Sequence, residues 1–270
     1  MTAATALVPA AAIQPKRGPW IAAHDAFAVT NRNLIALRRV PQLLVFSTIQ
    51  PVIFVLLFRY ALGGAIQVPG VPYVDYLMPG IFAQTVVFGA MGTAVGLATD
   101  LQTGIIERFR SLPMARSAVL VGRTTADLAR DAFVVVLMVV VGFAVGFNYY
   151  TNLAAFLASL LLVLLFGYVM AWIFAVVGLA VGDPEAAQAA AFPIMAPLVF
   201  ASSAFVPISS MPGWLQDFAN HQPLTATVNA ARALVLGGPT TEFVVRALAW
   251  DIGLLALAAP LAVWWYRRVT

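Results

Sequence analysis

One uncharged stretch limits the possible folds of this chain more than any other feature: the residues from Leu153 to Val181 include no Asp, Glu, Lys, Arg or His. A helix of about 20 apolar residues crosses the hydrocarbon layer of a bilayer, which is about 30 Å thick. The rest of the chain is similar, since 62% of its 270 residues are hydrophobic and 10% are charged, against about 25% charged in a soluble domain. We therefore expect an all-α polytopic membrane protein, because helices satisfy their own backbone in lipid.

Six transmembrane helices are expected within a membrane domain of residues 41–270. The spans are predicted at about residues 43–62, 76–99, 117–147, 153–181, 186–206 and 243–266. The second carries Ala90, Ala94 and Ala98 at every fourth position, a spacing that lets two helix backbones approach closely. That face is expected to pack against another helix. The alternative is that these alanines have no packing role, because small residues are common in membrane helices.

The third span cannot be apolar throughout, because uncharged sequence resumes only at Ala132. It is predicted to begin near Ser117, which brings charged residues into its first turns. Arg123 and Asp127 form an i,i+4 pair, and Asp127 and Arg130 form an i,i+3 pair. We expect these charges to be exposed at the membrane interface and to serve solubility.

Proline and Trp residues indicate the form of two other helices. Pro193, Pro197 and Pro207 predict an irregular or broken fifth span. Residues 19–40 have helical apolar spacing, which predicts an amphipathic helix in the membrane interface with Trp20 at headgroup level, or else a plain solvated linker helix. Residues 1–18 are expected to be a disordered cytoplasmic tail.

The distribution of basic residues predicts the orientation. With six spans and the N-terminus inside, 12 of the 15 Lys and Arg residues lie on the cytoplasmic side, and Arg59, Arg232 and Arg246 lie outside. Positive residues favour the cytoplasmic side. Both termini are therefore expected in the cytoplasm, and the basic residues line the membrane edge rather than forming a nucleic-acid site.

A charged segment from Asp100 to Asp131 joins the second and third spans on that side. Within it, Ile105, Phe109 and Leu112 share one helix face, and Pro113 ends the helix. The other face carries Glu107, Arg108 and Arg110. A helix over about residues 104–114 could lie in a groove on a partner protein, or it could fold back against the bundle.

No catalytic or cofactor pattern occurs in the chain. Phosphate-loop, zinc-protease and nucleophile-elbow motifs are missing, and there is no cysteine. The chain is therefore not expected to be an enzyme or to hold a metal or cofactor itself. A secondary carrier would need an internal repeat and ionisable groups at the membrane midplane, and neither is evident. A membrane-embedded enzyme would need a polar cluster within the bilayer.

Asp251 is the one acidic residue expected deep inside a span. A carboxylate at that depth is a functional hypothesis. The alternative is that it pairs with Arg246 or Arg232 near the outer surface.

Two motifs resemble a known family. The segment TGIIERFRSLPMAR, residues 103–116, resembles the intracellular loop of ABC-2 type transporter permeases. The segment GWLQDFANHQPLT with the later LGGP resembles their daunorubicin-resistance branch. The resemblance covers essentially the whole chain and implies the ABC-2 fold, also called type V exporter-like, with re-entrant outer helices between spans five and six.

The resemblance also implies roles for both segments. The coupling helix that contacts the ATPase would comprise Ile105, Glu107, Arg108, Phe109, Arg110, Leu112, Pro113 and Met114. The outer re-entrant segment, residues 211–239, would close the exit through Pro212, Gly213, Trp214, Phe218, His221 and Pro223.

The implied complex lies in the cytoplasmic membrane of a bacterium. It has two nucleotide-binding ATPase subunits, which hold ATP and Mg, and two permeases, identical or homologous. It moves hydrophobic or amphiphilic compounds such as a drug, polyketide or lipid out of the cytoplasm or inner leaflet. The alternatives are a secondary carrier without an ATPase and a permease for glycan or polysaccharide export.

Overall fold

The computed structural model describes residues 19–39, 41–66, 68, 70–106 and 116–269, and the regular structure in these ranges is entirely helical. The elements are α1 (Pro19–Arg39), α2 (Pro41–Leu56), η1 (Leu57–Leu62), α3 (Tyr73–Gln102), α5 (Arg116–Ala144), α6 (Leu153–Val181), α7 (Pro184–Phe200), η2 (Ile208–Ser210), α8 (Gly213–His221), α9 (Pro223–Leu236) and α10 (Thr240–Val269). The predicted all-α class is confirmed. Among the described helices, α3, α6 and α10 are long and apolar enough to cross a membrane.

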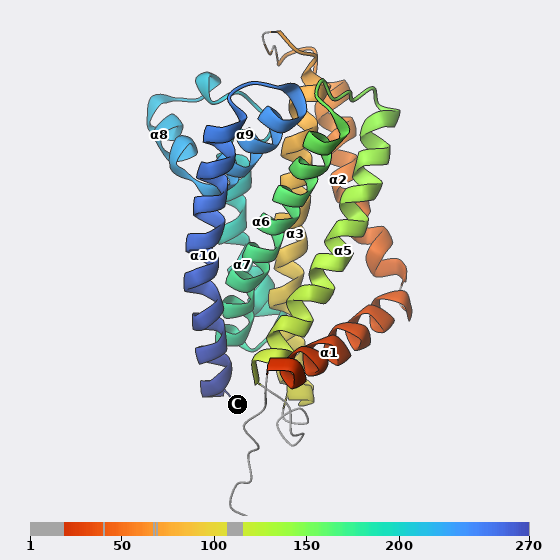
Figure 1. The fold of residues 1–270 in the computed structure, drawn as a ribbon, viewed down its shortest axis with the longest axis vertical. Helices are drawn as coiled ribbons and strands as arrows, with labels where there is room; N and C mark the ends of the chain where they lie inside the picture. The colour runs from red at the N-terminus through yellow and green to blue at the C-terminus, as the bar shows by residue number, and fades with distance from the viewer. Residues whose placement is uncertain (1–18, 40, 67, 69, 107–115, 270) are drawn as a thin grey trace, which may run out of the picture.

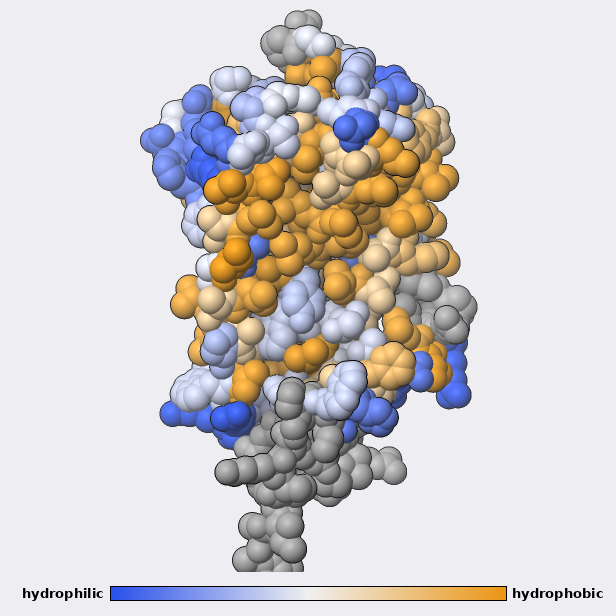
Figure 2. Space-filling view, in the orientation of Figure 1, coloured by the Kyte–Doolittle hydropathy of each residue, from blue (hydrophilic) through white to orange (hydrophobic). Residues whose placement is uncertain are grey.

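The long helices run side by side, and α3 lies among them in contact with α2, α5, α6, α7 and α9 (Figure 1). Helix α1 lies across one end of the bundle, the end at which α10 also finishes, whereas α8 and α9 lie at the opposite end (Figure 1). A broad hydrophobic band covers the flank between two more polar ends (Figure 2). Side chains of this kind on an outer surface identify a membrane protein.

The uncharged helix α6 has well-defined ends. At its start the Asn152 side chain accepts a hydrogen bond of 2.8 Å from the backbone N–H of Ala155. At its end Gly182 takes a left-handed conformation, with φ of 74°, which glycine adopts without a steric penalty. These caps place the long apolar run wholly within one helix.

The alanine face of α3 packs against α6, as its spacing predicts. Ala90, Ala94 and Ala98 are fully buried. On α6, Gly178 lies so close to the backbone of Ala94 that an added Cβ would overlap it. The predicted close approach of two helices at these alanines is therefore confirmed.

Helix α7 differs from the prediction. Pro193 and Pro197 lie inside a continuous helix, so the prediction of a break at these two residues is wrong. Both prolines are exposed on the outside of the bundle, and membrane helices tolerate the lost hydrogen bonds because neighbouring helices support them. The helix instead ends at Phe200, and irregular backbone follows from Ala201 to Pro207.

Candidate functional site: a buried charge network joining α1, α3 and α5

Helix α1 is attached to α5 at Gly122. A Cβ added to this glycine would lie 2.6 Å from the Cβ of Val29, so only glycine permits such a close approach. The Thr30 hydroxyl donates a hydrogen bond of 3.1 Å to the carbonyl oxygen of Gly122. Val29 is buried in the contact. The two helices therefore meet backbone to backbone at the end of the bundle.

Next to this contact, one face of α3 meets one face of α5 through polar side chains. The spacing on each helix, three or four residues at most steps, places the members on a single side. We call this set the α3–α5 polar seam; it consists of Gly89, Thr93, Gly96 and Asp100 on α3 and Arg123, Asp127, Arg130 and Asp131 on α5.

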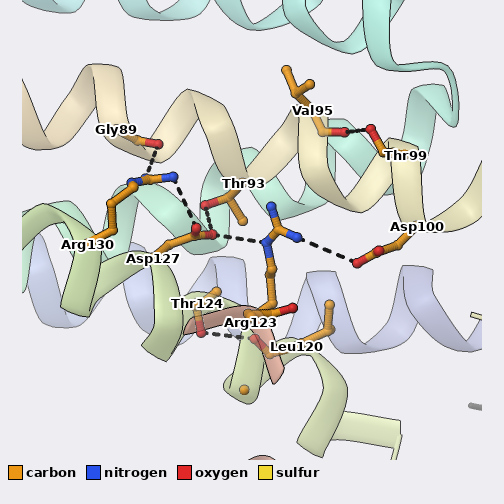
Figure 3. A network of polar contacts seen from close by, with 12 residues as sticks. Gly89, Thr93, Val95, Thr99, Asp100, Leu120, Arg123, Thr124, Asp127 and Arg130 are labelled. Carbon is orange, nitrogen blue, oxygen red and sulfur yellow. Dashed lines mark hydrogen bonds and ion pairs between the residues drawn. The ribbon is translucent and has the colours of Figure 1, made fainter. Parts of the chain in front are cut away.

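Asp127 is at the centre of the seam, between the guanidinium groups of Arg123 and Arg130 (Figure 3). Its Oδ2 accepts from Arg123 Nε at 3.3 Å, and its Oδ1 accepts from Arg130 Nη1 at 3.2 Å. The Thr93 hydroxyl donates to Oδ2 at 2.7 Å. One carboxylate on α5 is thus bonded to two arginines of its own helix and to α3. The predicted pairs of Asp127 with Arg123 and with Arg130 are confirmed.

Asp100 connects the seam to α1. Its Oδ2 lies 3.6 Å from Arg123 Nη1 and 3.6 Å from Arg32 Nη2, which belongs to α1. At the other end of the seam, Arg130 donates to the carbonyl oxygen of Gly89 at 2.6 Å and to Asp131 Oδ1 at 3.0 Å. Charged groups therefore join three helices that are far apart in the sequence.

Two glycines of α3 make room for these side chains. A Cβ at Gly96 would overlap the guanidinium of Arg123, and a Cβ at Gly89 would overlap the carboxylate of Asp131. Any larger residue would push the charged group out of its position. Gly89 and Gly96 therefore leave space for side chains of α5, while the alanines on the other face of α3 allow α6 to pack closely.

The expectation that these charges are exposed and serve solubility is wrong. Asp127 is 6% exposed and Asp131 is 3% exposed. Burial removes hydration from each charge, so each needs a partner. The three arginines, Arg32, Arg123 and Arg130, are balanced by three aspartates, Asp100, Asp127 and Asp131. The spacing of α5 contains this signal, because charges at i, i+4, i+7 and i+8 form a single face, and the matching Gly, Thr, Gly and Asp face of α3 completes it.

The predicted coupling residues lie next to the seam only in part. Glu107 to Met114 lie outside the described residues. Ile105 is half-buried, whereas its neighbour Ile106 is buried in a cluster with Leu97 and Leu120. Gly104 has φ of 70°, so the chain turns sharply where α3 ends.

The predicted outer residues lie on and beside α8. Pro212, Gly213, Trp214, Phe218 and His221 are exposed, Trp214 to 74%. Pro223 begins α9 and is partly buried. These residues are thus at the opposite end of the bundle from the seam, on a short helix whose aromatic side chains point outward.

Sequence reasoning missed the role of Arg232 on α9. This buried arginine donates to the carbonyl oxygens of Tyr76 at 2.8 Å, Ser203 at 2.5 Å and Ala204 at 3.0 Å. Its guanidinium also lies 3.5 Å from the centre of the Tyr76 ring. Arg232 therefore donates hydrogen bonds to the irregular backbone that follows α7, and it links α9 to α3.

The turn between α5 and α6 is held to the start of α3. The Tyr150 hydroxyl donates to Asp75 Oδ2 at 2.7 Å, and the backbone N–H of Asn148 donates to Asp75 Oδ1 at 2.8 Å. The bond to the carboxylate favours the protonated phenol and raises the pKa of Tyr150.

Asp251 on α10 is buried, but the expected pairing with Arg246 or Arg232 is not present. Arg232 is occupied by backbone carbonyls, and Arg246 donates to the carbonyl oxygen of Asn220. Neither oxygen of Asp251 has a hydrogen-bond partner among the residues that the structure describes. The two arginines instead donate to backbone carbonyls of the irregular segment after α7, of Tyr76 on α3 and of Asn220 on α8.

The described part of the chain offers no group of three or more His, Cys, Asp and Glu residues that could hold a metal ion. The acidic residues of the seam are occupied by arginines, so they are not placed as ligands. The arrangement links α1, α3 and α5 through ion pairs and hydrogen bonds.

The comparisons with known proteins agree on one family. Residues 24–236 match the ABC-2 type transporter family. The chain is 31% identical over 237 residues to the daunorubicin resistance ABC transporter permease protein DrrB1 of Streptomyces coeruleorubidus, covering 88% of this chain and 84% of that protein. It is 26% identical over 243 residues to the probable doxorubicin resistance ABC transporter permease protein DrrC of Mycobacterium tuberculosis, covering 89% and 87%. It is 24% identical over 214 residues to the putative transport permease ycf38 of Cyanophora paradoxa, covering 78% and 74%.

The helical bundle with its apolar flank and charge network defines an integral membrane protein. The chain belongs to the ABC-2 type transporter family. It is a permease subunit of an ATP-binding-cassette exporter, and membership of this family implies an ATPase partner.

Proposed function

We propose that this permease moves hydrophobic or amphiphilic compounds, such as a drug, polyketide or lipid, out of the cytoplasm or inner leaflet. The relatives named for daunorubicin and doxorubicin resistance support a drug among these. The end of the bundle that carries α1 faces the cytoplasm of a bacterial cell, together with both termini. Six helices, α2, α3, α5, α6, α7 and α10, cross the membrane, and α1 lies in the interface.

The observation that carries this proposal is the seam at the α1 end. The proposed coupling helix of residues 104–114 lies in the sequence between the end of α3 at Gln102, two residues after Asp100 of the seam, and the start of α5 at Arg116. Asp100 and Asp127 link α1, α3 and α5 to one another through ion pairs and a hydrogen bond. A push on the coupling helix therefore moves the three helices as one body rather than bending one of them.

The coupling helix is seated on a nucleotide-binding ATPase subunit through Ile105, Phe109 and Leu112. The complex has two such subunits, which hold ATP and Mg, and a second permease, identical or homologous. ATP binding closes the ATPase pair, and the movement alternates access to the pathway between the permeases. The permease holds no cofactor.

The outer segment of residues 211–239 closes the exit. Its exposed aromatic side chains on α8, Trp214 and Phe218, dip into the outer leaflet. Arg232 holds α9 against α3 and the irregular segment after α7, so movement of α3 reaches this end of the molecule directly.

A substitution on the apolar stripe tests the docking role. Phe109→Asp places a charge in the surface proposed to meet the ATPase, and we expect co-purification of the ATPase and export both to be lost. The matched control is Thr103→Asp, an exposed residue of the same segment outside the stripe, which should leave both intact. If Phe109→Asp leaves association and export at the level of the unsubstituted complex, residues 104–114 are not the docking helix.

A further inference from the structure

Asp251 has no electrostatic partner although it is almost fully buried. Its residue is 1% exposed, and both carboxylate oxygens lack a hydrogen-bond partner among the described residues. A carboxylate removed from water without a partner is unfavourable by several kcal/mol, on the order of the penalty for a buried ion. An ionisable residue inside a membrane helix is a functional-site hypothesis, because such residues mark substrate and ion pathways.

Among the side chains that the structure describes, the helices packed against α10 offer no cation that pairs with Asp251. Helix α6 contains no charged residue. On α9, Arg232 is committed to backbone carbonyls, and on α10 itself Arg246 is committed to the end of α8. On α5, Arg123 and Arg130 are paired within the seam. Among the described residues, no arginine is therefore placed to pair with Asp251.

Asp251 lies one turn beyond a contact between α9 and α10. In that contact Ala247 packs in one cluster with Ala226 and Ala230 of α9 and with Leu162 of α6. The next residue along α10, Ile252, is 67% exposed on the apolar flank. A molecule that reaches Asp251 from this flank must therefore be compatible with lipid.

We propose that Asp251 is a substrate-binding residue that takes the ammonium group of a cationic amphiphile when α9 moves away from α10. This inference rests on the proposed export function and names the class of substrate. The apolar surroundings determine which kind of molecule can bring the positive charge. A bare inorganic cation would lose its hydration shell, and one carboxylate would not replace it. An amphiphile also places its own apolar part against the adjoining apolar surface. The ammonium then forms a charge-assisted hydrogen bond with the carboxylate.

The test compares two probes in the complete permease–ATPase complex reconstituted in vesicles. One probe is a fluorescent dye with a primary amine and an alkyl chain, and the other is its N-acetylated, neutral analogue. For Asp251→Asn we expect KM for the amine to rise about tenfold or more, which corresponds to about 1.4 kcal/mol of binding energy, with transport of the neutral analogue unchanged. Asp251→Glu should retain a preference for the amine, and Glu242→Gln, an exposed carboxylate on the same helix, should change neither probe.

Two outcomes for Asp251→Asn overturn the inference and leave the export function standing. Unchanged transport of both probes means that the charge is not used in recognition. An equal loss for both probes means that Asp251 supports the fold and not the ligand. If the unsubstituted complex hydrolyses ATP and carries neither probe, the proposed export of amphiphiles fails and this inference fails with it.

Discussion

Gly96 and Arg123 show how one position on α3 is shaped by a side chain on α5. The guanidinium occupies the volume that a Cβ at residue 96 would need, and from there it reaches both Asp100 and Asp127. A glycine inside a helix is unfavourable by about 0.5–1 kcal/mol relative to alanine. The chain therefore gives up helix stability here to keep a buried ion pair in position.

Gly96→Ala is expected to destabilise the protein by about 1–3 kcal/mol, the usual effect of overpacking a well-packed interior, because the new methyl group displaces Arg123 from its carboxylates. The matched control is Gly253→Ala on α10, where a Cβ would meet nothing within 4 Å, so it should gain the helix preference of alanine. Thermal unfolding of both variants in detergent provides the comparison. Equal stabilisation by the two substitutions would mean that the seam does not depend on Gly96.

The burial and the partners of single charged residues were the features least predictable from the sequence. The pairs of Asp127 with Arg123 and Arg130 follow from helix spacing. Their burial does not, because it depends on which face of α3 lies opposite. The missing pairing of Asp251 could not be predicted from the sequence either. Arg232 and Arg246 were candidate partners, but both donate to backbone carbonyls instead.

At the scale of elements, one arginine of α9 links this helix to two other segments. Arg232 bonds three carbonyl oxygens from two separate segments, including the irregular backbone at Ser203 and Ala204. A broken helix inside a membrane protein is tolerated where other groups satisfy its backbone. Sequence alone placed irregular structure in this region and attributed it to prolines, two of which lie in regular helix.

Arg232→Gln should destabilise the outer end of the bundle by about 3 kcal/mol or more, because each buried carbonyl left without a donor costs about 1–3 kcal/mol. Arg232→Lys should recover little, since one ammonium group cannot reach the positions that the planar guanidinium spans. Arg246→Gln, which removes an exposed arginine with one bond to Asn220, is the control. Chemical unfolding followed by tryptophan fluorescence reports the change, and an effect of Arg232→Gln no larger than that of the control would exclude a bracing role.

For the whole molecule, composition was sufficient to identify an all-α membrane protein, and two short motifs indicated the family that the comparisons show. Hydropathy was less informative about α5, which carries too many charges to be recognised as a span by its apolarity alone. Those same charges join α5 to α3 and α1. The charges that obscure this helix in the sequence are thus the ones that join it to its neighbours.

We propose that the seam carries movement from the ATPase into the membrane. Simultaneous measurement of ATP hydrolysis and export by an Asp127→Asn complex tests this proposal. We expect the ATPase to remain bound and its hydrolysis to stay near the unsubstituted rate, while export falls about tenfold or more, as for a barrier raised by about 1.4 kcal/mol. Thr93→Val, which removes one bond of the seam and no charge, should give a smaller loss of export. Export that persists in full proportion to hydrolysis in Asp127→Asn would contradict the claim.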